Sequence, residues 1–376
     1  KGHCWQIAYI MMMTKKYPIA FDIGLHDIHA LQLDKSRGRF RIQSMFHQKL
    51  ENELTDIKQS SPDLINALKV IKKQGGFKGN RAVIHIPAHK VFSFPIEFVL
   101  KEDETMEEAI IREVDQNLPY PLEEAVIDYP SMTRSSKKKP QKVIIVSVHR
   151  SDIEEILTVF KKAGFRTDAL DFRPISSIRL HQYISKISED PSVICYVGRK
   201  ESSVQIFTND RILAMNKFSW GLRRIMDKLN TNLGFEPTTS NALDLLAQHG
   251  IKSSISEKSS ITVRSAVDNS DANIGPVVSR IITPTIEELV FEFHKILGYI
   301  RNKEGIHKIN DISFYGAASM ICGLDHYIQN RMNIPAKTIN ILDHIDIKPH
   351  LSAMVSNDIT PFAAALGLAM REISWL

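Results

Sequence analysis

The sequence predicts a two-lobed α/β protein with an α+β subdomain inserted in the first lobe. The chain has 376 residues, more than one compact core usually holds, so two domains or one bilobed body are expected. A run of short β segments joined by tight turns occurs twice, and the turn glycines Gly24 and Gly198 occupy the same place in each run. A block of mixed strands and helices separates the two runs. The repeat indicates an internal duplication, with one β meander at the start of each lobe.

Composition excludes several classes of protein. Hydrophobic residues make up 43% and charged residues 24% of the chain, which is typical of globular proteins and excludes bulk disorder. The net charge of +5 is small and scattered, so it does not indicate a nucleic-acid partner. Cys4, Cys195 and Cys322 form no close-spaced pair, so neither a disulfide framework nor a zinc site is predicted.

The first meander is predicted from two β segments within residues 17–33 and a third at 40–46. The second repeats this pattern at residues 193–198, 203–207 and 212–215. In both, alternating apolar residues are interrupted by short polar turns. Antiparallel strands over 193–215 are therefore the decisive test of the predicted duplication.

Between the two meanders, strands are predicted at 83–87, 91–99, 126–129 and 143–148, and the inserted block is expected to span about 91–172. A helix is expected over 106–118, with Ile111, Val114 and Leu118 on its apolar face and Pro119 ending it. A second helix is expected after a cap at Ser151 or Asp152, and Gly164 closes it. Its predicted core positions are Ile153, Ile156, Leu157 and Phe160.

The remaining chain predicts helices at 221–233, 240–249, 286–300, 324–332 and 362–373, and a strand at 309–316. Residues 253–276 are rich in Ser, Asn and Asp without periodicity, so they are expected to form a loop-rich stretch. Residues 1–10 precede Met11, Met12 and Met13 and are interpreted as an extension upstream of the true start. The apolar stretch 7–13 is far too short to cross a bilayer.

The sequence contains none of four motifs that mark enzyme classes: the P-loop, His-Glu-x-x-His, Gly-x-Ser-x-Gly and Cys-x-x-Cys. His85, His89, His149 and His181 could meet near the insertion, but scattered histidines are interpreted as structural or surface residues. The run Lys137-Lys138-Lys139 has no interleaved aromatic residues and is interpreted as a solvated loop tip. Contact of that run with anionic lipid is the alternative.

Residues 108–129 carry the most specific resemblance to a known family. They predict a helix, then the segment Leu118-Pro119-Tyr120-Pro121-Leu122-Glu123-Glu124, and then a strand ending in Asp128-Tyr129. This order resembles PilM-type type IV pilus assembly proteins, in the FtsA and PilM branch of the actin-like (ribonuclease H-like) superfamily. The resemblance extends from about residue 19 to residue 373, and it implies a bilobed fold that holds a nucleotide between its duplicated lobes.

The resemblance also implies a division of the chain. Residues 1–13 are expected to be a non-native or disordered extension. The first lobe is expected to begin at 14–90 (1A), to carry the inserted subdomain at 91–172 (1C) and to resume at 173–190. The second lobe is expected to comprise 191–233 (2A), 234–305 (2B) and the completing residues 306–376.

The resemblance implies ATP with Mg²⁺ as cofactor, but the nucleotide motifs are incomplete. Asp22 and Gly24 match the first phosphate motif, whereas His29 stands where the family has a lysine. Tyr196 replaces the second aspartate, and Leu222 and Tyr315 replace glycines. We therefore expect weak or absent ATP binding, no catalytic residue, and no metal ligand unless Asp22 is one; Asp22 could equally serve only to shape a hairpin turn. The candidate cofactor-binding residues are Asp22, Gly24, His29, Gly198, Ser202, Gly221 and Gly316.

The implied function is a cytoplasmic scaffold at the inner face of the cytoplasmic membrane, in a type IV pilus or related secretion or competence platform. In the family, a groove between insertion and first lobe binds the N-terminal tail of a PilN-like bitopic membrane protein. The candidate partner-binding region here is Leu118, Pro119, Tyr120, Pro121 and Leu122. Two alternatives remain: an ATPase, kinase-like enzyme or switch on the same fold, and an FtsA-like division protein.

Overall fold

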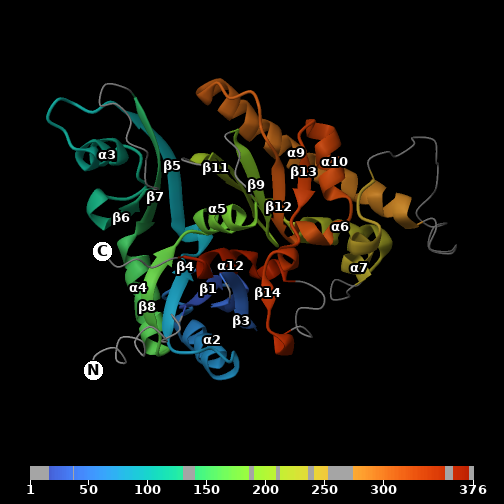
Figure 1. Cartoon of the computed structure of the whole chain (residues 1–376), viewed down its shortest axis with the longest axis horizontal. Coiled ribbons are helices and arrows are strands. Elements are labelled where there is room, and N and C mark those ends of the chain that lie inside the picture. Colours follow the sequence, from blue (N-terminus) through green and yellow to red (C-terminus); the bar gives the residue numbers. More distant parts are fainter. Residues whose placement is uncertain are drawn as a thin grey trace, which may run out of the picture.

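The computed structural model describes residues 17–36, 38–129, 140–185, 190–208, 212–235, 241–252, 274–351 and 359–371 (Figure 1). The expected extension at 1–13, the lysine run 137–139, most of the loop-rich stretch and the last residues after 371 lie outside the described residues.

The first lobe contains a six-stranded sheet of β1 (Ile19–Ile23), β2 (Asp27–Ser36), β3 (Arg39–Lys49), β4 (Arg81–His85), β8 (Arg166–Asp171) and β14 (Asp346–Ile347). Strands β1, β2 and β3 are consecutive and antiparallel, which confirms the first predicted meander. Strands β4 and β8 continue the sheet in parallel beyond β1, and β14 pairs with the opposite edge at β3.

The second lobe contains a five-stranded sheet of β9 (Ser192–Val197), β10 (Ser202–Phe207), β11 (Ile212–Phe218), β12 (Ile312–Gly316) and β13 (Ala336–Thr338). Strands β9, β10 and β11 are antiparallel, as predicted. The order β11-β10-β9-β12-β13 repeats the order β3-β2-β1-β4-β8 of the first sheet. The tight turns repeat as well, since Gly24 N donates to Asp27 O at 2.8 Å and Gly198 N donates to Glu201 O at 3.1 Å. The internal duplication is thereby confirmed.

Two helices, α5 (Arg173–Ile184) and α12 (Ala363–Ala369), lie between the two sheets (Figure 1). Helix α12 contacts β1, β2 and β4 of the first sheet and β12 of the second, while α5 contacts β9 and β10. The two helices pack closely, because a Cβ at Gly367 would meet Ser176 O at 2.1 Å. Sheet, helix pair and sheet therefore form three layers around one apolar core that extends from Ala20 and Leu31 to Ile194 and Phe207.

The outer faces of the sheets are covered by α2 (Ser61–Gln74), α4 (Arg150–Lys162), α6 (Leu222–Leu233), α7 (Asn241–Gln248), α9 (Ile274–Glu304) and α10 (Leu324–Met332). Helices α2 and α4 share a core with β1, and α6, α7 and α9 share another with β9. Helix α9 begins at Ile274, earlier than the predicted start at residue 286. Gly275 and Pro276, which were expected in the loop-rich stretch, belong to this helix. Helix α2 was not predicted, although its buried Leu64, Leu68 and Ile71 have helical spacing.

The inserted subdomain consists of β5 (Val91–Phe98), α3 (Met106–Val114), β6 (Ala125–Asp128) and β7 (Gln141–His149), with strand order β5-β7-β6. Helix α3 ends at Val114 and not before Pro119 as predicted. The polar residues that follow add nothing to the core, and the Asn117 side chain binds Glu113 O at the helix end. Its buried face is Ala109, Ile110 and Val114, so the prediction that placed Ile111 there was wrong.

Helix α4 also differs from its prediction. Its N-cap is His149, whose side chain accepts from Ser151 N, because β7 passes directly into the helix. Ile156, Val159 and Phe160 are buried, whereas Leu157 is 40% exposed.

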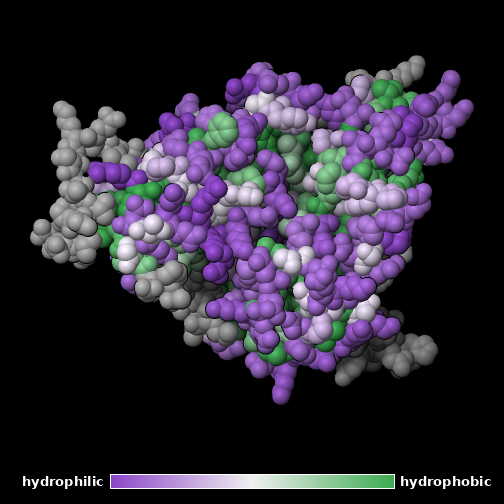
Figure 2. Space-filling view, turned by 180° about the vertical axis from the view of Figure 1, so that it is seen from behind, coloured by the Kyte–Doolittle hydropathy of each residue, from purple (hydrophilic) through white to green (hydrophobic). Residues whose placement is uncertain are grey.

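The last part of the chain contributes to both lobes. Strands β12 and β13 with α10 complete the second sheet, whereas β14 and α12 contact the first sheet. The face drawn in Figure 2 is mainly hydrophilic, with hydrophobic residues in small patches. Among the helices that the structure describes, none combines the length and the apolar character needed to cross a membrane.

Candidate functional site

Asp22 and Tyr196 occupy equivalent places in the two lobes. Each stands two residues before the turn glycine of its meander, and Asp22 pairs with His29 as Tyr196 pairs with Ser203. Ile19, Phe21 and Ile23 of β1 pack on the outer side of the sheet. Because side chains alternate along a strand, Asp22 points to the middle layer, where it is 3% exposed. The two equivalent positions therefore border the same inter-lobe space.

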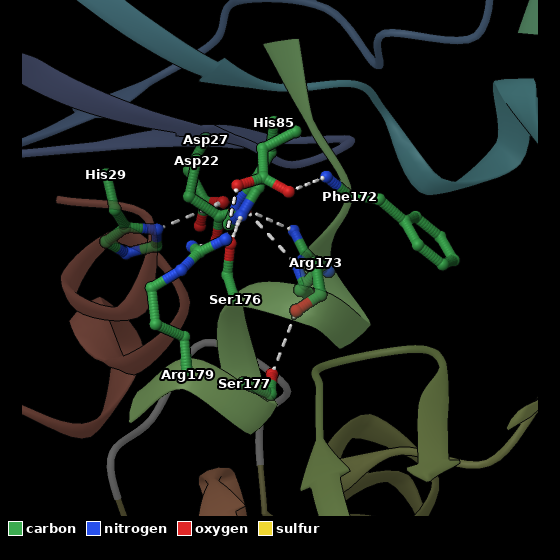
Figure 3. A network of polar contacts seen from close by, with 10 residues as sticks. Asp22, Asp27, His29, His85, Phe172, Arg173, Ser176, Ser177 and Arg179 are labelled. Atoms are coloured by element: carbon green, nitrogen blue, oxygen red, sulfur yellow. Dashed lines mark hydrogen bonds and ion pairs between the residues drawn. The ribbon is translucent and has the colours of Figure 1, made fainter. Parts of the chain in front are cut away.

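Arg173 connects these two positions. Its Nε and Nη2 donate to Asp22 Oδ1 at 3.1 and 2.8 Å (Figure 3). Its Cζ lies 5.6 Å from the centroid of the Tyr196 ring. Arg173 is the first residue of α5, so its place is set by the chain leaving β8. A cation at a helix N-terminus is unfavourable by itself. The Asp22 carboxylate and the Tyr196 ring face compensate it.

A chain of hydrogen bonds supports Asp22 from the other side. His85, at the end of β4, contacts Asp22 Oδ1 through Nδ1 at 2.9 Å and Ser176 Oγ through Nε2 at 2.8 Å (Figure 3). Because an ionised carboxylate only accepts, His85 Nδ1 must carry the proton. Arg179 Nη1 donates to Ser176 Oγ at 3.3 Å, which leaves the serine hydroxyl free to donate to His85 Nε2. Both ring nitrogens of His85 then have a hydrogen-bond partner.

The surroundings of Asp22 and Arg173 shift the pKa of each group toward its charged form. Burial alone would raise the pKa of Asp22, but the Arg173 guanidinium and the His85 hydrogen bond outweigh it and hold that pKa well below its usual range. Burial likewise opposes the charge of Arg173, but the neighbouring Asp22 carboxylate outweighs it and raises the pKa of the guanidinium. Asp22 and Arg173 therefore form a charged pair at neutral pH.

The other predicted cofactor-binding residues of the second lobe are engaged within the protein. Ser202 Oγ donates to Trp220 O at 2.6 Å, and Ser202 is 2% exposed. Gly221 is the N-cap of α6, and the first amide of that helix, Leu222 N, donates to Gly198 O at 3.0 Å. Gly316 has φ +72°, and a Cβ there would meet Val197 O at 2.3 Å. These glycines permit close packing of the chain on itself.

The first-lobe residues Gly24 and His29 lie on either side of the β1–β2 turn. A Cβ at Gly24 would come within 2.8 Å of Asp27 Oδ1, so the turn admits no larger residue without a shift. His29 Nδ1 lies 4.0 Å from Asp27 Oδ1 (Figure 3). Its ring is stacked on His47 of β3, with centroids 4.7 Å apart. His29 is thus part of a polar cluster on β2 and β3.

A small pocket lies beside Arg173. It has a volume of about 80 Å³, which is well below the roughly 300 Å³ or more of sites that enclose small-molecule ligands. Its lining includes Val91 of the insertion, Phe172 and Arg173 before and in α5, and Tyr196, Ser203 and Lys217 of the second sheet.

The candidate partner-binding segment, residues 118–122, lies along the inserted subdomain. Leu118 and Leu122 pack against the core of the insertion, while Pro119 and Pro121 are exposed. Tyr120 Oη is 2.8 Å from Ser147 Oγ, and its ring meets His149 edge-on at 5.2 Å. The segment is therefore fixed at the point where β7 passes into α4.

Sequence reasoning did not find Arg173, His85, Ser176 or Arg179 as site residues. His85 and His181 are buried, and His85 acts as a structural support of Asp22. The available signal was the run Asp171-Phe172-Arg173-Pro174, in which an arginine and a helix-starting proline follow a strand. The pairing of Arg173 with Asp22 joins residues far apart in the chain.

Comparison with known proteins identifies the family. The model of the family described as type IV pilus assembly protein PilM matches residues 20–244 and 275–373. A solved structure described as the PilM-PilN type IV pilus biogenesis complex is similar at a TM-score of 0.73 and 16% identity, covering 94% of this chain and 98% of that chain.

Two further solved structures are similar at lower scores. The ethanolamine utilization protein EutJ from Carboxydothermus hydrogenoformans has a TM-score of 0.49 and 10% identity over 94% of this chain and 89% of its own. MreB 5 of Spiroplasma citri bound to AMPPNP has a TM-score of 0.48 and 11% identity over 94% and 95%. The duplicated three-layer architecture is the actin-like fold. The chain belongs to the family of type IV pilus assembly proteins PilM.

Proposed function

We propose that this protein is a cytoplasmic actin-like scaffold of a type IV pilus assembly platform and that its nucleotide site is degenerate. It is held at the inner face of the cytoplasmic membrane by binding the N-terminal tail of a PilN-like bitopic membrane protein. The contact of Arg173 with both Asp22 and Tyr196 carries the first part of the proposal. Family membership supports the second part.

The Arg173 guanidinium bears most directly on nucleotide binding, because it lies against Asp22. In an intact site, a carboxylate at the Asp22 position orders metal-bound water beside the phosphates. Here Asp22 Oδ1 already binds a guanidinium and an imidazole, and Arg173 is tied into the chain. A Mg²⁺ ion at this carboxylate would lie beside the Arg173 guanidinium, and the repulsion between the two cations is costly unless Arg173 moves away. The residues present therefore do not fit a Mg²⁺–ATP complex.

The inserted subdomain carries the features that support a peptide partner. Phe92 on β5, Ile111 on α3 and Val126 on β6 are all exposed by more than a third. Exposed apolar side chains of this size can serve as anchors for an extended peptide. They occur in the same subdomain as the rigid segment 118–122. The solved complex described as PilM-PilN supports a PilN-like protein as the partner.

The competing function, an ATP-dependent enzyme or switch, requires Asp22 to be available to a metal. The Arg173 contact opposes it. An FtsA-like division protein would need an amphipathic membrane helix after the core, and the residues concerned, after 371, lie outside the described residues.

Calorimetry with Mg²⁺ and ATP tests the nucleotide proposal. We expect an affinity weaker than about 100 μM, which corresponds to about 5.5 kcal/mol of binding at most, and no hydrolysis. A micromolar dissociation constant that requires Mg²⁺ would overturn the proposal.

A labelled peptide that copies the cytoplasmic tail of the PilN-like protein tests the partner proposal. We expect micromolar binding by fluorescence anisotropy and at least about tenfold weaker binding to the double variant Pro119→Ala with Pro121→Ala, because the segment loses its two fixed φ angles. Pro349→Ala, at an exposed proline between β14 and the chain end, is the control and should bind as the unmodified protein does. Unchanged affinity in the double variant, or hydrogen-exchange protection confined to the second sheet, would place the partner elsewhere.

A further inference from the structure

Asp27, His29 and His47 bring three metal-binding side chains together on neighbouring strands. Asp27 and His29 are two residues apart on β2, so their side chains lie on the same face of the sheet. His47 lies directly opposite His29 on the antiparallel strand β3. The register of a hairpin thereby sets all three side chains on one face, beside the turn that follows Asp22.

The distances between Asp27 and the two histidines are long for direct hydrogen bonds and suit a metal ion shared by all three side chains. Asp27 Oδ2 lies 3.5 Å from His47 Nε2, and Asp27 Oδ1 lies 4.0 Å from His29 Nδ1. Both are at or beyond the limit of a good hydrogen bond. Tetrahedral zinc, with bonds of about 2.0–2.1 Å, places its ligand atoms about 3.3 Å apart. The three ligand atoms all lie within 4.8 Å of one another, so the site requires an approach of up to about 1.5 Å and a turn of one imidazole ring.

We propose that Asp27, His29 and His47 form a binding site for a divalent transition-metal ion of the Zn²⁺ type. Two imidazoles and one carboxylate are a ligand set that zinc accepts, and a water molecule would complete the tetrahedron. Nitrogen ligands disfavour Mg²⁺, which prefers oxygen. The site is therefore distinct in chemistry from a Mg²⁺–nucleotide site, and it does not depend on the proposed scaffold role.

The surroundings identify which side chain must move. His29 is held by His47 on one side and by the Phe362 ring at 4.9 Å on another, and its side chain is 13% exposed. The two imidazole planes are 9° from parallel, so one ion cannot lie in both planes as they stand. His47 is 40% exposed and can turn about its Cβ–Cγ bond. Metal binding would then clamp β2 to β3 next to the Gly24–Asp27 turn.

Titration of the full-length protein with Zn²⁺ tests the proposal, after dialysis against a chelator and then against chelator-free buffer. Calorimetry should give a saturable site with one ion per chain, and Co²⁺ in place of Zn²⁺ should give the visible absorption of a tetrahedral complex. Asp27→Asn and His47→Ala should each weaken binding at least about tenfold. Excess Mg²⁺ should not displace the ion.

His26→Ala is the matched control, because His26 lies in the adjacent turn, is also exposed and has Glu53 at 3.9 Å. It should leave the affinity unchanged. His47→Gln provides a second variant that keeps the side-chain bulk beside His29 while removing the ligand nitrogen. Absence of a saturable site below about 100 μM Zn²⁺, an affinity of the two His47 variants equal to that of the unmodified protein, or displacement by Mg²⁺ would overturn the proposal.

Discussion

Replacing Arg173 with alanine removes the cation that neutralises Asp22 between the lobes. The Asp22 side chain is 4% exposed and that of Arg173 is 24% exposed. Two opposite charges about 4 Å apart attract each other by about 4 kcal/mol at an effective dielectric constant of about 20. Breaking a buried pair by removing one partner typically costs about 3–5 kcal/mol. Because Arg173 is partly solvated and His85 still donates to Asp22, we expect Arg173→Ala to lower the free energy of unfolding by about 2–4 kcal/mol.

The pH dependence of this loss has a definite sign. In the unmodified protein the folded pKa of Asp22 is lowered, so the pair contributes stability above the unfolded pKa of about 3.9 and loses it as pH falls through the folded value. In Arg173→Ala, burial should instead raise the pKa of Asp22. The variant then gains stability relative to the unmodified protein as the pH falls from 7 toward 4, and the difference between them narrows.

Urea unfolding at pH 7 and at pH 4.5, with Asp22→Asn and the double variant completing a thermodynamic cycle, measures both effects. Arg331→Ala is the control, because Arg331 binds Glu287 through Nε and Nη2 at 2.8 and 2.7 Å but is 53% exposed. It should cost no more than about 1 kcal/mol. If Arg173→Ala costs no more than this control, or its cost is the same at both pH values, the charged-pair argument is wrong.

Two further predictions concern buried polar groups. Both amide atoms of Gln205 are buried without a hydrogen-bond partner, so Gln205→Met should raise the free energy of unfolding by about 1–2 kcal/mol in urea titrations; a loss of stability would show that the amide is satisfied, for example by buried water. Burial lowers the pKa of His181 to about 4, and the unfolded value is about 6.5, so up to about 3 kcal/mol of stability should be lost as the pH falls from 6.5 toward 4. His181→Gln should remove this part of the pH dependence, and an unchanged slope would contradict the assignment.

The local elements follow from short-range signals in the sequence. Each meander is predicted by alternating apolar residues and a glycine turn, because a strand buries every second side chain and a tight turn needs a residue without a Cβ. Repetition of that pattern predicts the duplication, and the segment 108–129 indicates the family. Predictions were less accurate for the buried face of a helix, because the core beneath the helix decides which residues point inward. Ile111 has the spacing of a core residue, yet the insertion places Ala109 and Ile110 inward.

The candidate site could be predicted only in part. The sequence by itself places Tyr196 where the family resemblance implies a second aspartate, and so predicts that a nucleotide site here would lack one carboxylate. Only the tertiary structure decided what happens to the remaining one, Asp22. Its partner Arg173 lies 151 positions away in the chain, on a helix that the middle layer packs between the sheets. The alternating pattern of a strand predicts on which face of the sheet a side chain lies. Which charged group lies next to that side chain depends on how the layers pack, and the packing is set by the whole core.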